Sequence, residues 1–311
     1  MKKFFVILLL CICFIPCIGI RYFLNTQALA PDSHRTDSVA QYERLAKRYP
    51  ETKIWTDSLK AYGALRDTML LMPSGERHHA LFAQREGASR TAVVLHGWRN
   101  TSIDFLHLAC FYYRHFGYNV LLPDLHAHGF SEGETIGMGW NERKDVIHWM
   151  EFAHQEFGCD SFVVHGVSMG AATAMNVAGE KLPTHFREVC FVEDCGFTSV
   201  WDEFSVRLLH DFSLSEFPLL PLASLVCKIS NGWNFTEASP LEQLKKSPYP
   251  MLFIHGTADT YVPFYMVNQL YEAKPGLKEL WITEGAVHNA SYSMYPEEYV
   301  ERIGHFLQHC R

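Results

Sequence analysis

Six short runs of apolar, mostly branched residues alternate with helix-length segments between residues 91 and 284, and this alternation strongly limits the possible folds. Runs that are apolar at successive positions are typical of parallel strands covered by helices on both faces. The segment between the second and third runs has an apolar stripe at helical spacing, formed by Val146, Met150, Ala153 and Phe157. Strands that alternate with helices predict a doubly wound, mostly parallel α/β sheet. The runs are TAVVLHG (91–97), YNVLLPD (118–124), SFVVHGV (161–167), EVCFVED (188–194), PMLFIHG (250–256) and KELWITE (278–284).

The strand runs belong to one main domain, which a separate segment precedes. Residues 31–64 are predicted to form a helical lead-in, and residues 65–311 the main domain. That domain begins with a predicted hairpin, because RDTMLLMP and RHHALFAQRE flank Ser74-Gly75. Residues 197–247 are strongly apolar but have no strand pattern. They are predicted to form a helical cap insertion over the carboxyl edge of the sheet, where open α/β sheets bind ligands, or else two ordinary covering helices.

Composition and charge exclude some classes of protein. The chain is 48% apolar and 20% charged, as expected for a globular domain with a packed core. Its formal net charge of −7 and the lack of a basic stripe argue against nucleic-acid binding. The nine cysteines have no zinc-finger spacing, and several lie among apolar residues, which is typical of buried free thiols.

The first 30 residues differ from the rest of the chain. Two lysines precede an uncharged run from Phe4 to Ile20, which has the length of a long signal-peptide core or a short membrane span. The lysines favour a cytoplasmic start and export of the remainder. Ala28-Leu29-Ala30 matches a cleavage signal but lies well beyond the apolar run. We therefore expect an exported protein that segment 1–30 anchors in the cell membrane, or a secreted or periplasmic protein if that segment is cleaved.

The stretch GVSMG (166–170) places Ser168 between two glycines, directly after the run SFVV and before an alanine-rich segment. A strand, a tight turn and a helix in this order are the context that a nucleophile elbow requires. The glycines fit such a turn, because side chains at 166 and 170 would collide with the neighbouring strand and helix. The pattern predicts that Ser168 is a nucleophile held on a sharp turn.

A serine hydroxyl needs a base to accept its proton and a third group to orient that base. Asp259 directly follows the fifth strand run, and His288 lies in the loop after the sixth. Both positions are at the carboxyl edge of the sheet, the edge that presents Ser168. We therefore predict a Ser168, His288 and Asp259 triad. Asp194, at the end of the run EVCFVED, is the alternative carboxylate.

Two backbone N–H groups are predicted to form an oxyanion hole. Attack on a carbonyl develops negative charge on its oxygen, and preorganised N–H donors stabilise that charge. One predicted donor is Met169, the residue after the nucleophile, and the other is Trp98, which follows the first strand run. Gly97 leaves room for the backbone to approach the reacting oxygen.

With these motifs in this order, the chain resembles the α/β-hydrolase superfamily over roughly residues 65–309. It is similar in particular to exported or membrane-anchored bacterial hydrolases related to serine aminopeptidase and prolyl oligopeptidase catalytic domains. The resemblance rests on VVLHGW, LLPDLHAHGFSEG, HGVSMGA and FIHGTADTYVP, and it implies the α/β-hydrolase fold. The sequence departs from the family pattern at DLHAHG, where D-x-R-G-x-G is frequent, and at Val287, where glycine is common before the histidine.

Several functions remain open. We expect a serine hydrolase that cleaves ester, thioester or amide bonds through an acyl-enzyme. A carboxylesterase for apolar acyl or aromatic esters is the first choice, because an apolar insertion over the site would contact such groups. One alternative is an aminopeptidase-like serine peptidase, which would need acidic groups to bind an amine; another is a non-catalytic hydrolase-like module that binds a membrane partner or lipid. Asp124, His126 and His128 in DLHAHG have donor types that metals use. Because the α/β-hydrolase resemblance makes this stretch a loop near the pocket, we expect no metal there. A serine triad requires no cofactor, so none is expected.

Overall fold

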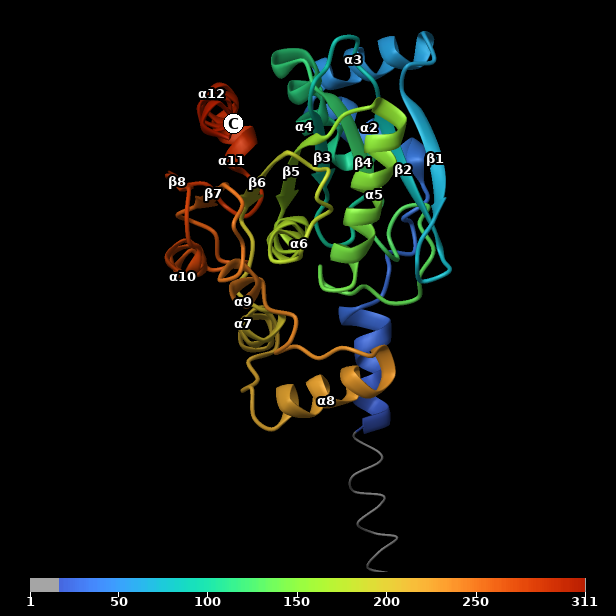
Figure 1. Ribbon diagram of the computed structural model, residues 1–311. Helices are drawn as coiled ribbons and strands as arrows, with labels where there is room; N and C mark the ends of the chain where they lie inside the picture. The colour runs from blue at the N-terminus through green and yellow to red at the C-terminus, as the bar shows by residue number, and fades with distance from the viewer. Residues whose placement is uncertain (1–16, 311) are drawn as a thin grey trace, which may run out of the picture.

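The computed structural model describes residues 17–310. They form a central sheet with helices around it (Figure 1). Its eight strands lie in the order β1-β2-β4-β3-β5-β6-β7-β8. β2 pairs antiparallel with β1 and with β4, and the remaining neighbours are parallel. The predicted mostly parallel sheet and the hairpin at Ser74-Gly75 are confirmed. The strands are β1 (Arg66–Leu71), β2 (Arg77–Ala83), β3 (Thr91–Leu95), β4 (Asn119–Pro123), β5 (Ser161–Val167), β6 (Glu188–Asp194), β7 (Met251–Gly256) and β8 (Lys278–Thr283).

Helices cover both faces of the sheet, as its apolar strands require. Val93 and Leu95 of β3 belong to the apolar core on one face, to which α5, α6 and α10 also contribute. Ala92 and Val94 point to the opposite face, because side chains alternate along a strand, and belong to the core there, to which α4 and α12 contribute. The larger helices are α2 (Ser38–Arg48), α3 (Pro50–Ala61), α4 (Leu106–Phe111), α5 (Glu142–Phe157), α6 (Met169–Ala178), α7 (Val200–Phe212), α8 (Leu219–Asn231), α10 (Tyr265–Ala273) and α12 (Pro296–His309). The shorter ones are η1 (Leu24–Ala28), η2 (Ile103–Phe105), η3 (Tyr112–Phe116), α9 (Pro240–Leu244) and α11 (Ser291–Met294).

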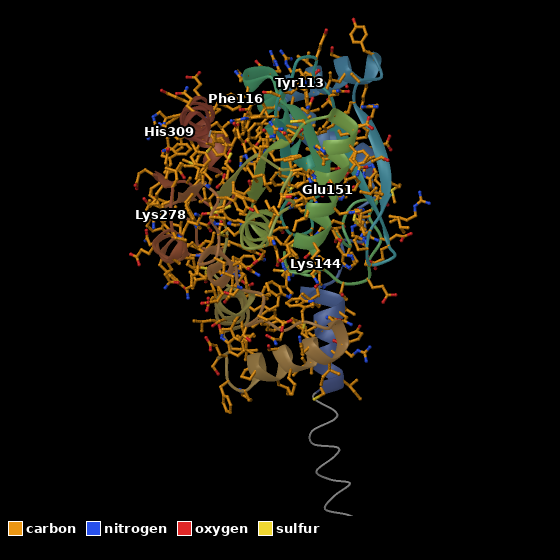
Figure 2. All side chains as sticks on the ribbon, viewed as in Figure 1. Tyr113, Phe116, Lys144, Glu151, Lys278 and His309 are labelled. Carbon is orange, nitrogen blue, oxygen red and sulfur yellow. The ribbon has the colours of Figure 1, made fainter. Side chains whose placement is uncertain are left out.

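Local sequence signals set where several helices begin and end. The side chains of Asp37, Ser199 and Ser239 accept hydrogen bonds from backbone N–H groups in the first turns of α2, α7 and α9. Helix α5 ends at Gly158, which adopts a left-handed conformation with φ of 66°. Side chains fill the space between the sheet and its helices (Figure 2). The predicted stripe of α5 is part of this packing, since Val146, Met150 and Ala153 are fully buried.

Two segments lie at one end of the molecule, below the sheet in Figure 1. One is the connection between β6 and β7, which holds the helices α7, α8 and α9. The other is the described part of the N-terminal segment, where helical residues 17–23 continue into η1. Most of the uncharged run 4–20 lies outside the described residues. Among residues 17–310, no helix combines the length and the apolarity needed to cross a membrane.

Candidate active site

Ser168 occupies the tight turn between β5 and α6. Its φ of 57° is unusual for a residue with a side chain and is typical of a strained turn. A Cβ at Gly166 would lie 2.0 Å from the carbonyl oxygen of Gly170, and a Cβ at Gly170 would lie 2.1 Å from that of Leu95. Both positions therefore need glycine, for the steric reason that the sequence predicted.

Three predicted residues meet at the carboxyl edge of the sheet. The Nε2 atom of His288 lies 2.8 Å from Oγ of Ser168, and its Nδ1 atom lies 2.7 Å from Oδ2 of Asp259. With its proton on Nδ1, the imidazole donates to the carboxylate and accepts from the hydroxyl. Such an arrangement can accept the proton of Ser168 while Asp259 fixes the orientation of the ring.

Asp259 is held as a carboxylate. Its Oδ1 atom accepts hydrogen bonds from the backbone N–H groups of Tyr261 (2.9 Å) and Val262 (3.0 Å). Burial raises the pKa of Asp259, but hydrogen bonds with His255 and His288 outweigh that effect and hold the pKa at about 2. Sequence reasoning missed His255, whose Nε2 lies 3.4 Å from Oδ2 of Asp259. Its position on β7, four residues before Asp259, was the available signal.

Asp194, the alternative carboxylate, has other partners. Its carboxylate accepts hydrogen bonds from the hydroxyls of Tyr299 (2.8 Å) and Ser291 (3.4 Å). Its backbone carbonyl accepts a 2.8 Å hydrogen bond from the N–H of Ser168. Asp194 therefore supports the turn at Ser168, whereas His288 is paired with Asp259.

The two predicted oxyanion donors flank Ser168. Met169 is the first residue of α6, so its N–H has no acceptor within the helix. The loop before Trp98 passes close to the serine, because a Cβ at Gly97 would lie 3.5 Å from Cβ of Ser168. The next residue, Arg99, has a left-handed φ of 58°, and its N–H donates a 3.1 Å hydrogen bond to Nε2 of His128.

The residues of DLHAHG separate into two groups. Asp124 accepts hydrogen bonds from the N–H groups of Ser102 (2.7 Å) and Phe130 (3.1 Å) and contacts Nδ1 of His79 at 2.7 Å. Both ring nitrogens of His128 are also engaged, since Nδ1 donates to the carbonyl of His126 at 2.8 Å. Asp124 and His128 therefore stabilise the loops beside Ser168, while the ring of His126 has different neighbours.

A cavity of about 490 Å³ opens beside Ser168. Its lining is mainly apolar and comes largely from the α7 to α8 region and from the N-terminal segment, with the loops beside Ser168 completing it. The α8 ribbon and the N-terminal helix lie side by side in Figure 1. The N-terminal contribution includes Ile20, Phe23, Leu24 and Ala28. The sequence alone did not assign these residues to the site, because segment 1–30 is predicted to be an anchor or a signal peptide.

One buried acidic group also lines the cavity. Glu203 of α7 is 3% exposed, and neither carboxylate oxygen has a hydrogen-bond partner among residues 17–310. Its Oε1 lies 4.0 Å from Nε of Arg207. Burial raises the pKa of Glu203 to about 8, although the charge of Arg207 opposes the shift. The sequence alone did not single out Glu203, because acidic residues are common near the start of a helix.

The strand order and the serine turn at the end of β5 define an α/β hydrolase. The chain belongs to the alpha/beta hydrolase family, whose model matches residues 92–302. It is 30% identical over 273 residues to the uncharacterized protein YqkD of Bacillus subtilis, covering 85% of this chain and 86% of that protein. It is 27% identical over 198 residues to an uncharacterized membrane protein of Saccharomyces cerevisiae, covering 62% of each. Among solved structures it is similar to the esterase Pf2001 of Pyrococcus furiosus, with a TM-score of 0.65 and 25% identity, covering 81% of this chain and 95% of that chain.

Proposed function

We propose that the protein is a serine hydrolase in which Ser168 is the nucleophile, His288 the general base and Asp259 the group that orients the base. The observation that carries this proposal is the continuous hydrogen-bonded line from Oγ of Ser168 through His288 to Asp259, with contacts of 2.8 and 2.7 Å. These distances lie within the range in which a nucleophile and its base act together.

The reaction follows from this line of groups. As Oγ of Ser168 attacks the carbonyl carbon, Nε2 of His288 accepts the hydroxyl proton, and Asp259 stabilises the imidazolium. The N–H groups of Met169 and Trp98 stabilise the charge on the carbonyl oxygen. His288 then protonates the leaving alcohol, which leaves an acyl group on Ser168. Water, deprotonated by His288, releases the acid and restores the hydroxyl.

We propose a carboxylic ester with an apolar acyl or aromatic group as the substrate. The apolar lining of the cavity beside Ser168 supports this choice of substrate. An apolar group can be buried there without losing hydrogen bonds to water. The similarity to a solved esterase at 25% identity points in the same direction.

A peptidase of the aminopeptidase type is the second candidate, and Glu203 is the observation that favours it. A substrate ammonium group in the cavity would supply the missing partner of this buried carboxylate and favour its charged form. We therefore expect Glu203→Gln to lower kcat/KM for aminoacyl anilides much more than for neutral esters, if the protein is a peptidase.

We also propose that the N-terminal segment holds the exported domain at the cell membrane. The uncharged run 4–20 leads directly into the end of the molecule where Ile18, Phe217 and Ile229 are 59%, 79% and 78% exposed. Exposed apolar side chains in one region are typical of a surface that contacts another apolar phase. Fractionation of cells that express the full chain tests this: we expect it with the membranes, and recovery in the soluble fraction would contradict the proposal.

Labelling with a fluorophosphonate probe tests the proposed chemistry. Labelling of the full chain that is lost in Ser168→Ala supports a serine hydrolase, provided that circular dichroism shows both proteins folded. A folded wild-type protein that is not labelled would instead favour a non-catalytic binding module. Comparison of p-nitrophenyl esters of graded chain length with aminoacyl anilides then separates the two candidate substrates, and turnover of the anilides alone would favour the peptidase.

A further inference from the structure

We propose that Glu76, His78 and His126 bind one divalent transition-metal ion, with Zn²⁺ as the expected ion. The three residues come from the turn before β2, from β2 itself and from the loop after β4. Other residues line the cavity beside Ser168, so this site is separate from the proposed reaction. The inference does not depend on the proposed function.

The three donor atoms have the spacing of ligands to a single ion. Oε2 of Glu76 lies 3.1 Å from Nδ1 of His126 and 3.8 Å from Nε2 of His78, and the two nitrogens are 3.4 Å apart. Bonds of about 2.0–2.1 Å at tetrahedral angles place two ligands of Zn²⁺ about 3.3–3.4 Å apart. The same three atoms thus form a triangle of the size that one ion requires.

The burial of His78 is a second, independent observation. Its side chain is 1% exposed, and its Nε2 atom faces Nδ1 of His126 at 3.4 Å, which is long for a hydrogen bond. Its other nitrogen, Nδ1, has no hydrogen-bond partner among the described residues. A buried imidazole normally satisfies its polar atoms. An ion between the two rings would satisfy Nε2 and leave Nδ1 free to act as a donor.

The carboxylate of Asp145, on α5, faces Nδ1 of His78 as an acceptor. Its Oδ2 atom lies 3.6 Å from Nδ1 of His78. Histidines that bind metals usually donate their second ring nitrogen to a carboxylate or carbonyl, which fixes the ring and its tautomer. Binding of an ion at Nε2 places the proton of His78 on Nδ1. A small movement of either side chain would then shorten the 3.6 Å separation to a hydrogen bond between Nδ1 of His78 and Oδ2 of Asp145.

The backbone around His126 leaves room for its ring beside Glu76 and His78. Gly133 has a φ of 130°, and a Cβ there would lie 2.7 Å from Cε1 of His126. Glycine therefore leaves the space that the ring occupies. The antiparallel pairing of β2 with β4, in which Ala80 lies opposite Pro123, brings the two histidines together across 48 positions of sequence.

The donor set indicates the metal and its role. Two imidazoles and a carboxylate suit Zn²⁺ and not Mg²⁺ or Ca²⁺, which prefer oxygen ligands. Three protein ligands leave the fourth position to water. An ion here would join the β1–β2 hairpin to the loop whose His128 accepts the hydrogen bond from Arg99. We therefore expect bound metal to stabilise the fold around that loop.

A surface cluster in the same chain provides a matched control. Glu279, His305 and His309 also bring three donor atoms together, but the two histidine side chains are 64% and 48% exposed. His309 lies on the outer side of the molecule (Figure 2). A double variant, His305→Ala with His309→Ala, removes this exposed cluster and leaves the proposed site intact.

The test uses the untagged full chain, treated with EDTA, dialysed and titrated with Zn²⁺ in competition with a chromophoric chelator. We expect wild type and the surface double variant to bind one Zn²⁺ with equal affinity and to gain melting temperature from it. Glu76→Gln should lose this binding and this gain, and Asp145→Asn should weaken binding by about 10- to 100-fold. Glu76 is partly exposed, so its variant is expected to fold, as circular dichroism will verify.

Two results would overturn the proposal. One is loss of Zn²⁺ binding in the surface double variant with unchanged binding in Glu76→Gln. The other is wild-type protein that neither binds Zn²⁺ stoichiometrically nor changes its melting temperature when Zn²⁺ is added.

Discussion

The indole Nε1 of Trp98 donates a 3.2 Å hydrogen bond to the backbone carbonyl of Ala28. The adjacent Arg99 donates to the carbonyls of Gln27 (2.7 Å) and Ala30 (3.2 Å). The loop that carries a predicted oxyanion donor thus holds the N-terminal segment by its backbone. Changes in that segment should therefore affect both the stability of the domain and the cavity beside Ser168.

Leu29→Ala tests whether the N-terminal segment is part of the folded domain. Leu29 is fully buried, and its carbonyl accepts a 2.8 Å hydrogen bond from the N–H of Ile136. Truncation of a buried leucine leaves a cavity, so we expect the free energy of unfolding to fall by about 2–5 kcal/mol in urea titrations. Val39→Ala, on the exposed side of α2, should change it by less than about 0.5 kcal/mol. Equal effects of the two changes would mean that Leu29 does not pack as described.

Phe23→Ala tests the N-terminal wall of the cavity. Phe23 lines the cavity, and its ring meets that of Phe212 edge to face at 5.9 Å. Loss of this apolar contact should lower kcat/KM for p-nitrophenyl decanoate about tenfold relative to the acetate, which corresponds to about 1.4 kcal/mol. Tyr22→Ala is the control, because Tyr22 is 71% exposed and lies outside the lining. The same chain-length profile in both variants would exclude a role for Phe23 in acyl binding.

Much of the fold could be predicted from local pattern, because buried parallel strands are apolar on both of their faces. The runs around Val93 and Val163 are examples, and each forms a strand of the sheet. The positions of Asp259 and His288 followed from topology, because residues just after parallel strands gather at one edge of the sheet. There His288 contacts Asp259, 29 positions away in sequence, and Ser168, 120 positions away.

Contacts that depend on packing between distant segments could not be predicted in this way. The apolar residues of the N-terminal segment resemble an anchor, and only the folded structure brings Phe23 to the cavity. Proximity in sequence groups His126 with Asp124 and His128. The register of β2 against β4 instead brings it to Glu76 and His78.

Asp259→Asn should identify the carboxylate that orients His288. The amide cannot hold the imidazole in the same tautomer, so we expect kcat for a p-nitrophenyl ester to fall by about 10⁴-fold with little change in KM. Asp194→Asn is the matched comparison: its carboxylate contacts Tyr299 and Ser291, and its loss should reduce kcat far less. The reverse order of the two effects would assign the role to Asp194.

Glu193→Gln should change how stability depends on pH. Glu193 is fully buried; its Oε2 accepts a 3.0 Å hydrogen bond from the N–H of Gly196, while Oε1 has no partner among residues 17–310. Burial raises its pKa to about 8, although the charge of His255 and the hydrogen bond from Gly196 oppose the shift. The folded protein therefore retains a proton that the unfolded chain loses near pH 4.3.

The stabilisation from this proton is fully present below about pH 4.3 and is lost as the pH rises toward about 8. Over that window, Glu193 makes the unfolding free energy fall by up to about 1.4 kcal/mol per pH unit. Glutamine keeps the shape of the side chain but does not ionise. In guanidinium titrations between about pH 5 and 8, the unfolding free energy of Glu193→Gln should therefore fall less steeply with pH than that of wild type, by up to about 1.4 kcal/mol per pH unit. Glu272→Gln, at an exposed position on α10, should retain the wild-type decline. If the slope in Glu193→Gln equals that of wild type, the carboxyl of Glu193 does not carry a proton that the unfolded chain lacks.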